Sequence, residues 1–289
     1  MLKNKKKILV LGASGMLGST IFRLFNESDD FDVIGAVRSS SSIDLFDADL
    51  QKLIVTDIDA DNIESFKTLI HKMQPEVVIN CIGLVKQLSD INDPLVALPI
   101  NSLLPHRLAR ICSNIGSRFI HMSTDCLFTG DKGLYTEADI PDSQDLYGVS
   151  KRLGEVNYPN SITLRTSIIG HELNGNRSLI SWFLSQEEKV TGFKRAIFSG
   201  LPTVEMARLI RDYVIPNIQL HGVYHVSAEP INKFDLLSLV ANIYGKDIEI
   251  LEDNNFVIDR SLDSSSFRKE TGYHPPPWPE LVKSMYDFG

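Results

Sequence analysis

Tyr147 and Lys151 are the pair of residues in this sequence that points most directly to proton transfer, because they stand four positions apart. On a helix this spacing places both side chains on one face. An ammonium beside a phenol stabilises the phenolate, so Lys151 is expected to lower the pKa of Tyr147 toward the working range of a general acid. A Tyr-x-x-x-Lys pattern alone also occurs on solvated helix faces, and that alternative stays open at this point.

The hydroxyl of Thr124 is a second feature that could take part in chemistry. It lies in Ser123-Thr124-Asp125, at the end of a run that is typical of a buried strand. In a parallel sheet, side chains at the carboxyl end of a strand face the ligand crevice. We therefore expect the Thr124 hydroxyl to hydrogen-bond the carbonyl group of a substrate.

A glycine turn follows the first apolar run, in the order Gly12-Ala13-Ser14-Gly15-Met16-Leu17-Gly18. The first two glycines permit a tight turn and close approach of a pyrophosphate to a helix N-terminus, and the third permits close packing of helix and strand. A turn without a ligand in another α/β protein is the alternative. The context favours a dinucleotide bound by Gly12, Gly15, Met16, Leu17 and Gly18.

The ends of the second and third apolar runs bear on which dinucleotide is bound. NAD sites usually carry an acidic residue after the second strand, whereas this sequence has Arg38, which can pair with the 2′-phosphate of NADP. Asp57 and Ile58 follow the third run, where they would flank the adenine. The sequence therefore favours NADP, with NAD as the alternative; an exposed surface Arg and a solvated Asp are the structural alternatives.

The elements that must position these residues alternate between strand and helix. Nearly continuous apolar runs predict buried strands, and helical spacing predicts helices between them. This alternation indicates a doubly wound, parallel α/β sheet of the Rossmann type. The expected strands are Lys7–Leu11, Asp32–Val37, Lys52–Thr56, Glu76–Asn80, Arg118–Ser123, Ile162–Thr166 and Val223–Ser227, and the expected helices are Met16–Phe25, Ile63–His71, Ile100–Ser113, Ser178–Glu187, Thr203–Val214 and Lys233–Tyr244.

We expect two domains. Residues 1–165 would form the dinucleotide-binding domain, with a returning segment near 195–225, and residues 166–289 a smaller C-terminal α/β substrate domain. The proline-rich stretch His274–Pro279 is not expected to form a regular element.

Composition limits the classes of protein that fit. The chain has 289 residues, 43% hydrophobic and 23% charged, and a net charge of −8, which argues against disorder and against a nucleic-acid-binding surface. Its three cysteines lack paired spacing and its histidines do not cluster, so we expect a reduced, cytoplasmic protein without a metal site. No apolar run reaches the ~18 residues of a membrane span, and the lysines before Ile8 fit a strand better than a signal peptide.

Together these motifs resemble the extended branch of the short-chain dehydrogenase/reductase family, which acts on nucleotide-sugars. The motifs that carry the resemblance occur in the same order along the chain as in that family: the glycine turn, Asp57-Ile58, Asn80-Cys81-Ile82-Gly83, Asn101 and the Tyr147/Lys151 pair. Within that branch the sequence looks most like the dTDP-4-dehydrorhamnose reductases, over Ser123–Gly130, Leu164–Ser167, Gly200–Thr203, Gly222–Val226 and Asp259–Asp263.

The resemblance implies hydride transfer from the nicotinamide to the C4 ketone of a 4-keto-6-deoxy nucleotide-sugar, for surface polysaccharide synthesis. Tyr147 would be the general acid, Lys151 its pKa partner and ribose ligand, and Thr124 would orient the carbonyl. The remaining implied contacts are Cys81, Ile82, Gly83 and Asn101 with the cofactor, and Asp125, Cys126, Ile168 and Arg260 with the substrate. A homodimer is compatible with this interpretation, and Lys86 and Gln87 are further candidates to reach the sugar.

Three departures from the family pattern keep alternatives open. Cys126 replaces the Glu of 4,6-dehydratases, so the acid that expels water is missing. Cys126 and Ile168 also stand where dehydrorhamnose reductases usually carry Tyr and Trp. Enzymes that resemble GDP-fucose synthase place a catalytic Cys at position 126, so an epimerase/reductase is one alternative and a Cys without a chemical role another. A non-catalytic, NADP-binding regulatory subunit is the last alternative, although such proteins often lose the Tyr or Lys.

Overall fold

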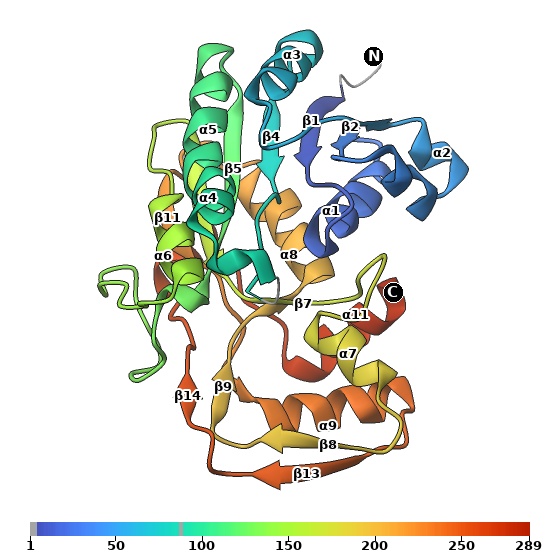
Figure 1. The fold of residues 1–289 in the computed structure, drawn as a ribbon, viewed down its shortest axis with the longest axis vertical. Helices are drawn as coiled ribbons and strands as arrows, with labels where there is room; N and C mark the ends of the chain where they lie inside the picture. The colour runs from blue at the N-terminus through green and yellow to red at the C-terminus, as the bar shows by residue number, and fades with distance from the viewer. Residues whose placement is uncertain (1–4, 87–88) are drawn as a thin grey trace.

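The computed structural model describes residues 5–86 and 89–289, and its centre is a parallel sheet of seven strands. The strand order is β11-β6-β5-β4-β1-β2-β3, and every adjacent pair is parallel (Figure 1). The strands are β1 (Lys6–Leu11), β2 (Phe31–Ala36), β3 (Ile54–Val55), β4 (Val77–Asn80), β5 (Arg118–Thr124), β6 (Ser161–Thr166) and β11 (Gly222–His225). The expected doubly wound α/β sheet is confirmed.

Alternate residues of β1 serve the two faces of this sheet. Ile8 and Val10 belong to a core shared with α1 (Met16–Asn26) and α8 (Thr203–Leu209). Leu9 and Leu11 belong to a second core, shared with α3 (Ile63–Met73) and α5 (Leu104–Asn114). The sheet is therefore covered on both faces, which explains the nearly continuous apolar strands.

The order of the strands reverses between β1 and β4, so the crevice at their carboxyl ends is the place where doubly wound folds bind ligands. The glycine turn follows β1, and Cys81 follows β4. The two connections touch: a methyl group on Gly12 would lie 3.1 Å from the backbone of Cys81 and Ile82.

The later part of the chain builds small sheets and helices beyond these carboxyl ends (Figure 1). Strand β9 (Ala196–Phe198) lies between β12 (Ile231–Asn232) and β14 (Ile258–Asp259), β8 (Lys189–Phe193) pairs with β13 (Glu249–Asp253), and β7 (Ile168–Ile169) pairs with β10 (Leu201–Pro202). The helices of this part are α7 (Leu179–Ser185), α9 (Lys233–Tyr244), α10 (Ser265–Thr271) and α11 (Trp278–Phe288). Because α8 packs on the large sheet and β11 is its edge strand, residues of the later half complete the dinucleotide-binding domain. The domain boundary at residue 165 stays a prediction.

The predicted elements differ from the structure at a few places. The third strand has two residues rather than five, and Leu98–Leu103 and Ile210–Val214 are π-helical turns joined to α5 and α8. The expectation that His274–Pro279 is irregular is wrong at its end, since Trp278 begins α11. Pro279 fits there because the first turn of a helix needs no N–H donor. The remaining short elements are η1 (Ser40–Leu45), α2 (Ala48–Gln51), η2 (Ser89–Asn92), α4 (Pro94–Ala97), η4 (Asp125–Leu127) and α6 (Leu146–Leu153).

Among the residues that the structure describes, none of the helices is both long and apolar enough to cross a membrane.

Candidate active site

The residues expected to perform chemistry meet where β5 ends and α6 begins. Thr124 is the last residue of β5, and its hydroxyl lies close enough to Tyr147 to favour the charged form of that phenol. Helix α6 packs closely here, since a side chain on Gly148 would lie 2.6 Å from the carbonyl oxygen of Cys126. The structure thus brings together two residues that are far apart in the sequence.

The start of α6 is fixed by its cap. Asp145 Oδ1 accepts a hydrogen bond of 2.7 Å from the backbone N–H of Gly148. Asp145 Oδ2 also pairs with Lys86 Nζ at 2.6 Å, which links the helix cap to the loop after β4. Lys86 is therefore engaged by the helix cap, and Gln87 lies outside the described residues. These bonds hold the turn that carries Tyr147.

Lys151 is buried on the same helix, and its Nζ donates a hydrogen bond of 2.6 Å to the carbonyl oxygen of Met122. Burial lowers the pKa of Lys151 to about 8, and the nearby Glu155 opposes this shift. The expectation that Lys151 lowers the pKa of Tyr147 is wrong here. Burial raises the pKa of Tyr147, and Cys126 adds to the rise, while the ammonium is directed at Met122.

Asn101 connects the loop after β4 to α6. Its Oδ1 accepts from the N–H of Leu84 at 2.9 Å, and its Nδ2 donates to Ser150 Oγ at 3.1 Å. Asn101 is almost fully buried, so the structure gives it a positioning role. Its contact with the cofactor stays a prediction.

The first residues of the loop after β4 are tied to the ends of β1 and β4. The N–H of Cys81 donates to Leu11 O at 3.0 Å, and the N–H of Ile82 donates to Asn80 Oδ1 at 3.2 Å. Gly83 is exposed, and a methyl group there would lie 3.7 Å from Lys151 Nζ. Gly83 therefore stands beside Lys151, and the contacts of Cys81, Ile82 and Gly83 with the cofactor stay predictions.

The glycine turn has the geometry of an anion site. Gly12 has a φ of 76°, in the left-handed region that favours glycine. Gly15 caps α1 without a side-chain hydrogen bond, so the first amides of the helix, at Met16 and Leu17, are not capped by a side chain. Unpaired amides and the helix dipole together favour a phosphate at this end.

The residues predicted to select the dinucleotide lie beside this turn. Arg38 is exposed, and within residues 5–86 and 89–289 it makes neither a hydrogen bond nor an ion pair. Asp57 is also exposed and has a φ of 63°, which is unusual for a residue with a side chain. Ile58 is only 7% exposed and packs in the core with Leu9, so little of it is available to cover an adenine. Contacts of all three with the cofactor stay predictions.

The predicted substrate residues gather next to Thr124. Arg260 Nε donates to Phe128 O at 2.8 Å, and the guanidinium also reaches Cys126 Sγ at 3.7 Å. Burial raises the pKa of Cys126 to about 12, with a further rise from Asp125, so the thiol stays protonated at neutral pH. Ile168 is the first residue of β7, where it pairs with Leu201.

Two charged residues near this edge were missed by sequence reasoning. Glu155 forms a buried, bidentate pair with Arg165, at 2.7 Å for both bonds, and accepts from Ser123 Oγ at 2.8 Å. Lys233, at the start of α9, acts electrostatically on Asp125 and Cys126. Neither residue stands in a motif, and only the packing of distant segments brings them to the edge of the sheet.

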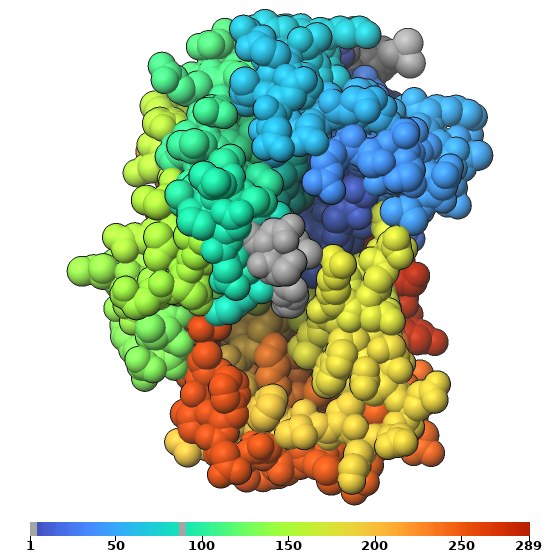
Figure 2. All heavy atoms as spheres, in the orientation of Figure 1, coloured from blue at the N-terminus to red at the C-terminus, as the bar shows by residue number. Residues whose placement is uncertain are grey.

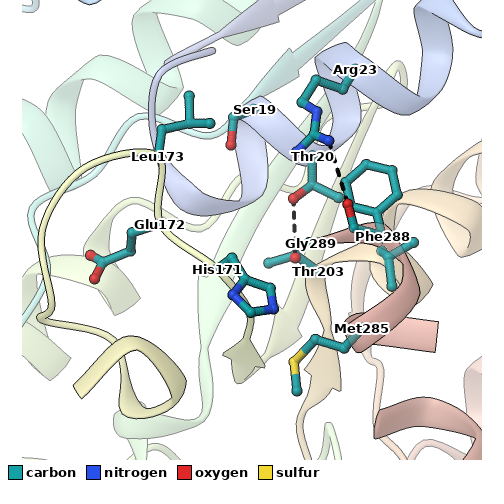
Figure 3. A pocket seen from close by; sticks show the side chains of 11 residues that line it. Ser19, Thr20, Arg23, His171, Glu172, Leu173, Thr203, Met285, Phe288 and Gly289 are labelled. Carbon is teal, nitrogen blue, oxygen red and sulfur yellow. Dashed lines mark hydrogen bonds between the residues drawn. The ribbon is translucent and has the colours of Figure 1, made fainter. Parts of the chain in front are cut away.

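The surface is hollowed on the side shown in Figure 2, between the yellow and the orange-red segments of the later half. A separate cavity of about 190 Å³ lies behind α1, between α8, α11 and the segment after β7 (Figure 3). Thr20 and Thr203 hydrogen-bond across it at 3.1 Å, and Arg23 donates to Phe288 O at 3.4 Å. Its lining includes none of Thr124, Tyr147 and Lys151, so we do not assign the chemistry to it.

The described residues contain no cluster of His, Cys, Asp or Glu that could hold a metal ion.

Comparison with known proteins agrees with this arrangement. A family model described as the RmlD substrate binding domain matches residues 6–288. The chain belongs to the RmlD family. The predicted resemblance is thereby confirmed at the level of the family.

Two curated relatives and one solved structure illustrate the range of RmlD-like proteins. A probable low-salt glycan biosynthesis reductase, Agl14 of Haloferax volcanii, is 26% identical, and the match covers 92% of this chain and 93% of the relative. The mouse methionine adenosyltransferase 2 subunit beta is 29% identical over 52% of this chain and 42% of that protein. The dTDP-4-dehydrorhamnose reductase of Bacillus anthracis, solved with NADP, is 21% identical; 98% of this chain and 99% of that chain align, with a TM-score of 0.80.

Proposed function

We propose that this chain is a reductase that uses NADPH to reduce the C4 ketone of a 4-keto-6-deoxy nucleotide-sugar, with NADH as the weaker cofactor. The observation that carries the proposal is that Thr124, at the carboxyl edge of the sheet, lies beside Tyr147, on the helix that also carries the buried Lys151. Membership in the RmlD family and the likeness to the glycan biosynthesis reductase Agl14 support the substrate class. Its expected place is the cytoplasm, in agreement with three cysteines that form no disulfide.

The residues at the crevice fit the nicotinamide cofactor. The amides at the start of α1 and the glycine turn would hold the pyrophosphate, and Arg38 the 2′-phosphate. Asp57 would hold the adenine, with only the small exposed part of Ile58 beside it. The bound cofactor supplies a hydride. Tyr147 would give its proton to the carbonyl oxygen, Thr124 would orient that oxygen, and Lys151 would hold the ribose beside Gly83.

An epimerase/reductase is less well supported. A base must lose its proton before it can take one from the sugar, and the pKa of Cys126 is raised to about 12. In heavy water the wild type and Cys126→Ser should therefore incorporate equally little deuterium into the ring. Exchange that depends on the Cys126 thiol would favour the epimerase.

A regulatory subunit is the second candidate, because about half of the chain matches methionine adenosyltransferase 2 subunit beta. The presence of Thr124, Tyr147 and Lys151 supports catalysis instead.

Single-turnover oxidation of bound NADPH by 4-keto-6-deoxy nucleotide-sugars tests the choice between these functions. We expect oxidation of NADPH with at least one such sugar. Tight binding of NADPH without oxidation by any of them would favour the regulatory subunit.

A further inference from the structure

Lys233 occupies a fixed position beside the candidate active site. It is the first residue of α9, and the preceding Asn232 caps that helix through a 2.8 Å bond from the N–H of Asp235. Asn232 is itself paired with Ile197 across the sheet β9–β12. The Lys233 Nζ lies 3.9 Å from the centre of the Phe198 ring, which is buried. Capping, strand pairing and the aromatic ring therefore hold the ammonium in place.

The ammonium of Lys233 has unused hydrogen-bonding capacity. In the part of the chain that the structure describes, it makes no hydrogen bond and no ion pair. Burial lowers its pKa to about 8, so most of it is charged at neutral pH. An ammonium has three donors, and because the Lys233 side chain is half-buried these donors are open to water or to a ligand. A ligand that supplies oxygen atoms can take the place of that water.

Two other lysines of the same region show how such charges are otherwise satisfied. Lys151 donates to the carbonyl oxygen of Met122. Lys194 also stands over an aromatic ring, that of Phe234, but it pairs with Asp235 at 2.7 Å. Lys233 differs from both: it lies over the ring of Phe198 but has no hydrogen-bond acceptor or carboxylate partner among the described residues.

The neighbours of Lys233 indicate which oxygen it would meet. Its charge acts on Asp125, whose carboxylate accepts from the Thr124 hydroxyl at 3.2 Å. A carboxylate near the ammonium disfavours a diphosphate, which only accepts hydrogen bonds and is negatively charged. A hydroxyl group both donates and accepts, so it suits an acid and an amine together.

We propose that Lys233 is a substrate-binding residue that donates a charge-assisted hydrogen bond to the hydroxyl on C3 of the sugar, next to the reacting C4 carbonyl. This assignment rests on the proposed function, because the carbonyl is placed at Thr124 and Tyr147. In a 4-keto-6-deoxy sugar, C3 carries the hydroxyl that neighbours C4, whereas C5 carries the methyl group.

Calorimetric titration of the NADP-loaded enzyme with dTDP-rhamnose and with dTDP tests this role. Hydrogen bonds to charged groups are worth about 1.5–3 kcal/mol, so Lys233→Met should weaken binding of dTDP-rhamnose by about 10-fold to 100-fold. Binding of dTDP should change less than about twofold. Lys233→Arg should recover part of the loss, and the matched control Lys194→Met should bind both ligands like the wild type.

Two results would overturn the assignment. Equal weakening of both ligands by Lys233→Met would place Lys233 on the diphosphate, and unchanged binding of both would leave it a structural residue. If Lys233→Met does not fold, the wild-type protein can answer the same question. The 3-deoxy analogue of dTDP-rhamnose, which lacks the C3 hydroxyl, should bind to the wild type about 10-fold to 100-fold more weakly than dTDP-rhamnose. Equal binding of the analogue would reject the proposal.

These titrations need no turnover, so they separate this inference from the proposed function. Sugar-dependent loss of binding without NADPH oxidation by any keto sugar would keep the role of Lys233 and reject the reductase.

Discussion

Tyr147 can serve as an acid without the lowered pKa that its spacing from Lys151 predicted. Because burial raises its pKa, the phenol keeps its proton at neutral and moderately alkaline pH. Tyr147→Phe should therefore lower the rate of reduction by at least ~10²–10⁴-fold and leave NADPH binding nearly unchanged. Single-turnover oxidation and a fluorescence titration of NADPH measure the two effects. A variant that oxidises NADPH at the wild-type rate would exclude Tyr147 as the acid.

The pH dependence should instead reflect Lys151, whose pKa is lowered to about 8. The ammonium carries the positive charge below that pH and loses it as the pH rises. If the charged form supports reduction, kcat should be level at pH 7 and fall through about pH 8. Lys151→Arg should move this fall to higher pH, since Arg stays protonated. A wild-type rate constant that stays level to pH 10 would contradict this role.

Arg38 is available for the 2′-phosphate of NADP, since it is exposed and lacks partners among the described residues. A charge-assisted bond is worth about 1.5–3 kcal/mol, so NADPH should bind about tenfold or more tightly than NADH. Arg38→Ala should remove most of that preference. Direct titration with both cofactors measures it, and equal dissociation constants in the wild type would reject the role of Arg38.

At the junction of β1 and α1, Gly18 and Gly15 have different roles: Gly18 permits close packing, and Gly15 is expected to permit cofactor binding. A methyl group on Gly18 would lie 2.1 Å from Gly12 O, whereas one on Gly15 would lie 3.4 Å from the same atom. Gly18→Ala should therefore lower the free energy of unfolding by about 1–3 kcal/mol, as overpacking does. Gly15→Ala should fold normally, since its methyl group would make only a van der Waals contact, but it should weaken NADPH binding because Gly15 is the N-cap residue at the proposed phosphate site. Thermal melts and cofactor titrations distinguish the two, and equal stability of both variants would contradict this assignment.

The strands and helices that depend on local sequence patterns were predicted well. The buried strands of the large sheet and the helices α1, α3 and α9 follow from apolar runs and helical spacing, with boundaries within a few residues. The pairs in the small sheets have two to five residues each, and pairing of distant segments rather than propensity creates them.

The same distinction applies to the candidate site. Thr124, Tyr147 and Lys151 were found because strand ends and helix spacing are local features. Lys233 comes from a segment more than eighty residues away from all three, so no spacing reveals it. The direction of the pKa shift of Tyr147 was also wrong, because burial and the bond from Lys151 to Met122 depend on tertiary packing.

The molecule as a whole is more interdependent than its two predicted domains imply. The core on one face of the large sheet joins Ile162 and Leu164 of β6 to Val204 and Leu209 of α8. Strand β11 then covers the edge of β6 over four residue pairs. A fragment of residues 1–166 would lose both, which would expose apolar surface and an unpaired strand edge.

We therefore expect the fragment 1–166 to lack a cooperative thermal transition and to bind no NADPH, although it contains the glycine turn, Arg38, Tyr147 and Lys151. A longer fragment, residues 1–228, restores α8 and β11 and should recover part of the structure, because it keeps that side of the core and the covered edge. Calorimetry and NADPH titration of both fragments beside the full chain make the comparison. If residues 1–166 unfold cooperatively and bind NADPH like the full chain, the returning segment is dispensable for the dinucleotide-binding domain, and the boundary near residue 165 is a true domain boundary.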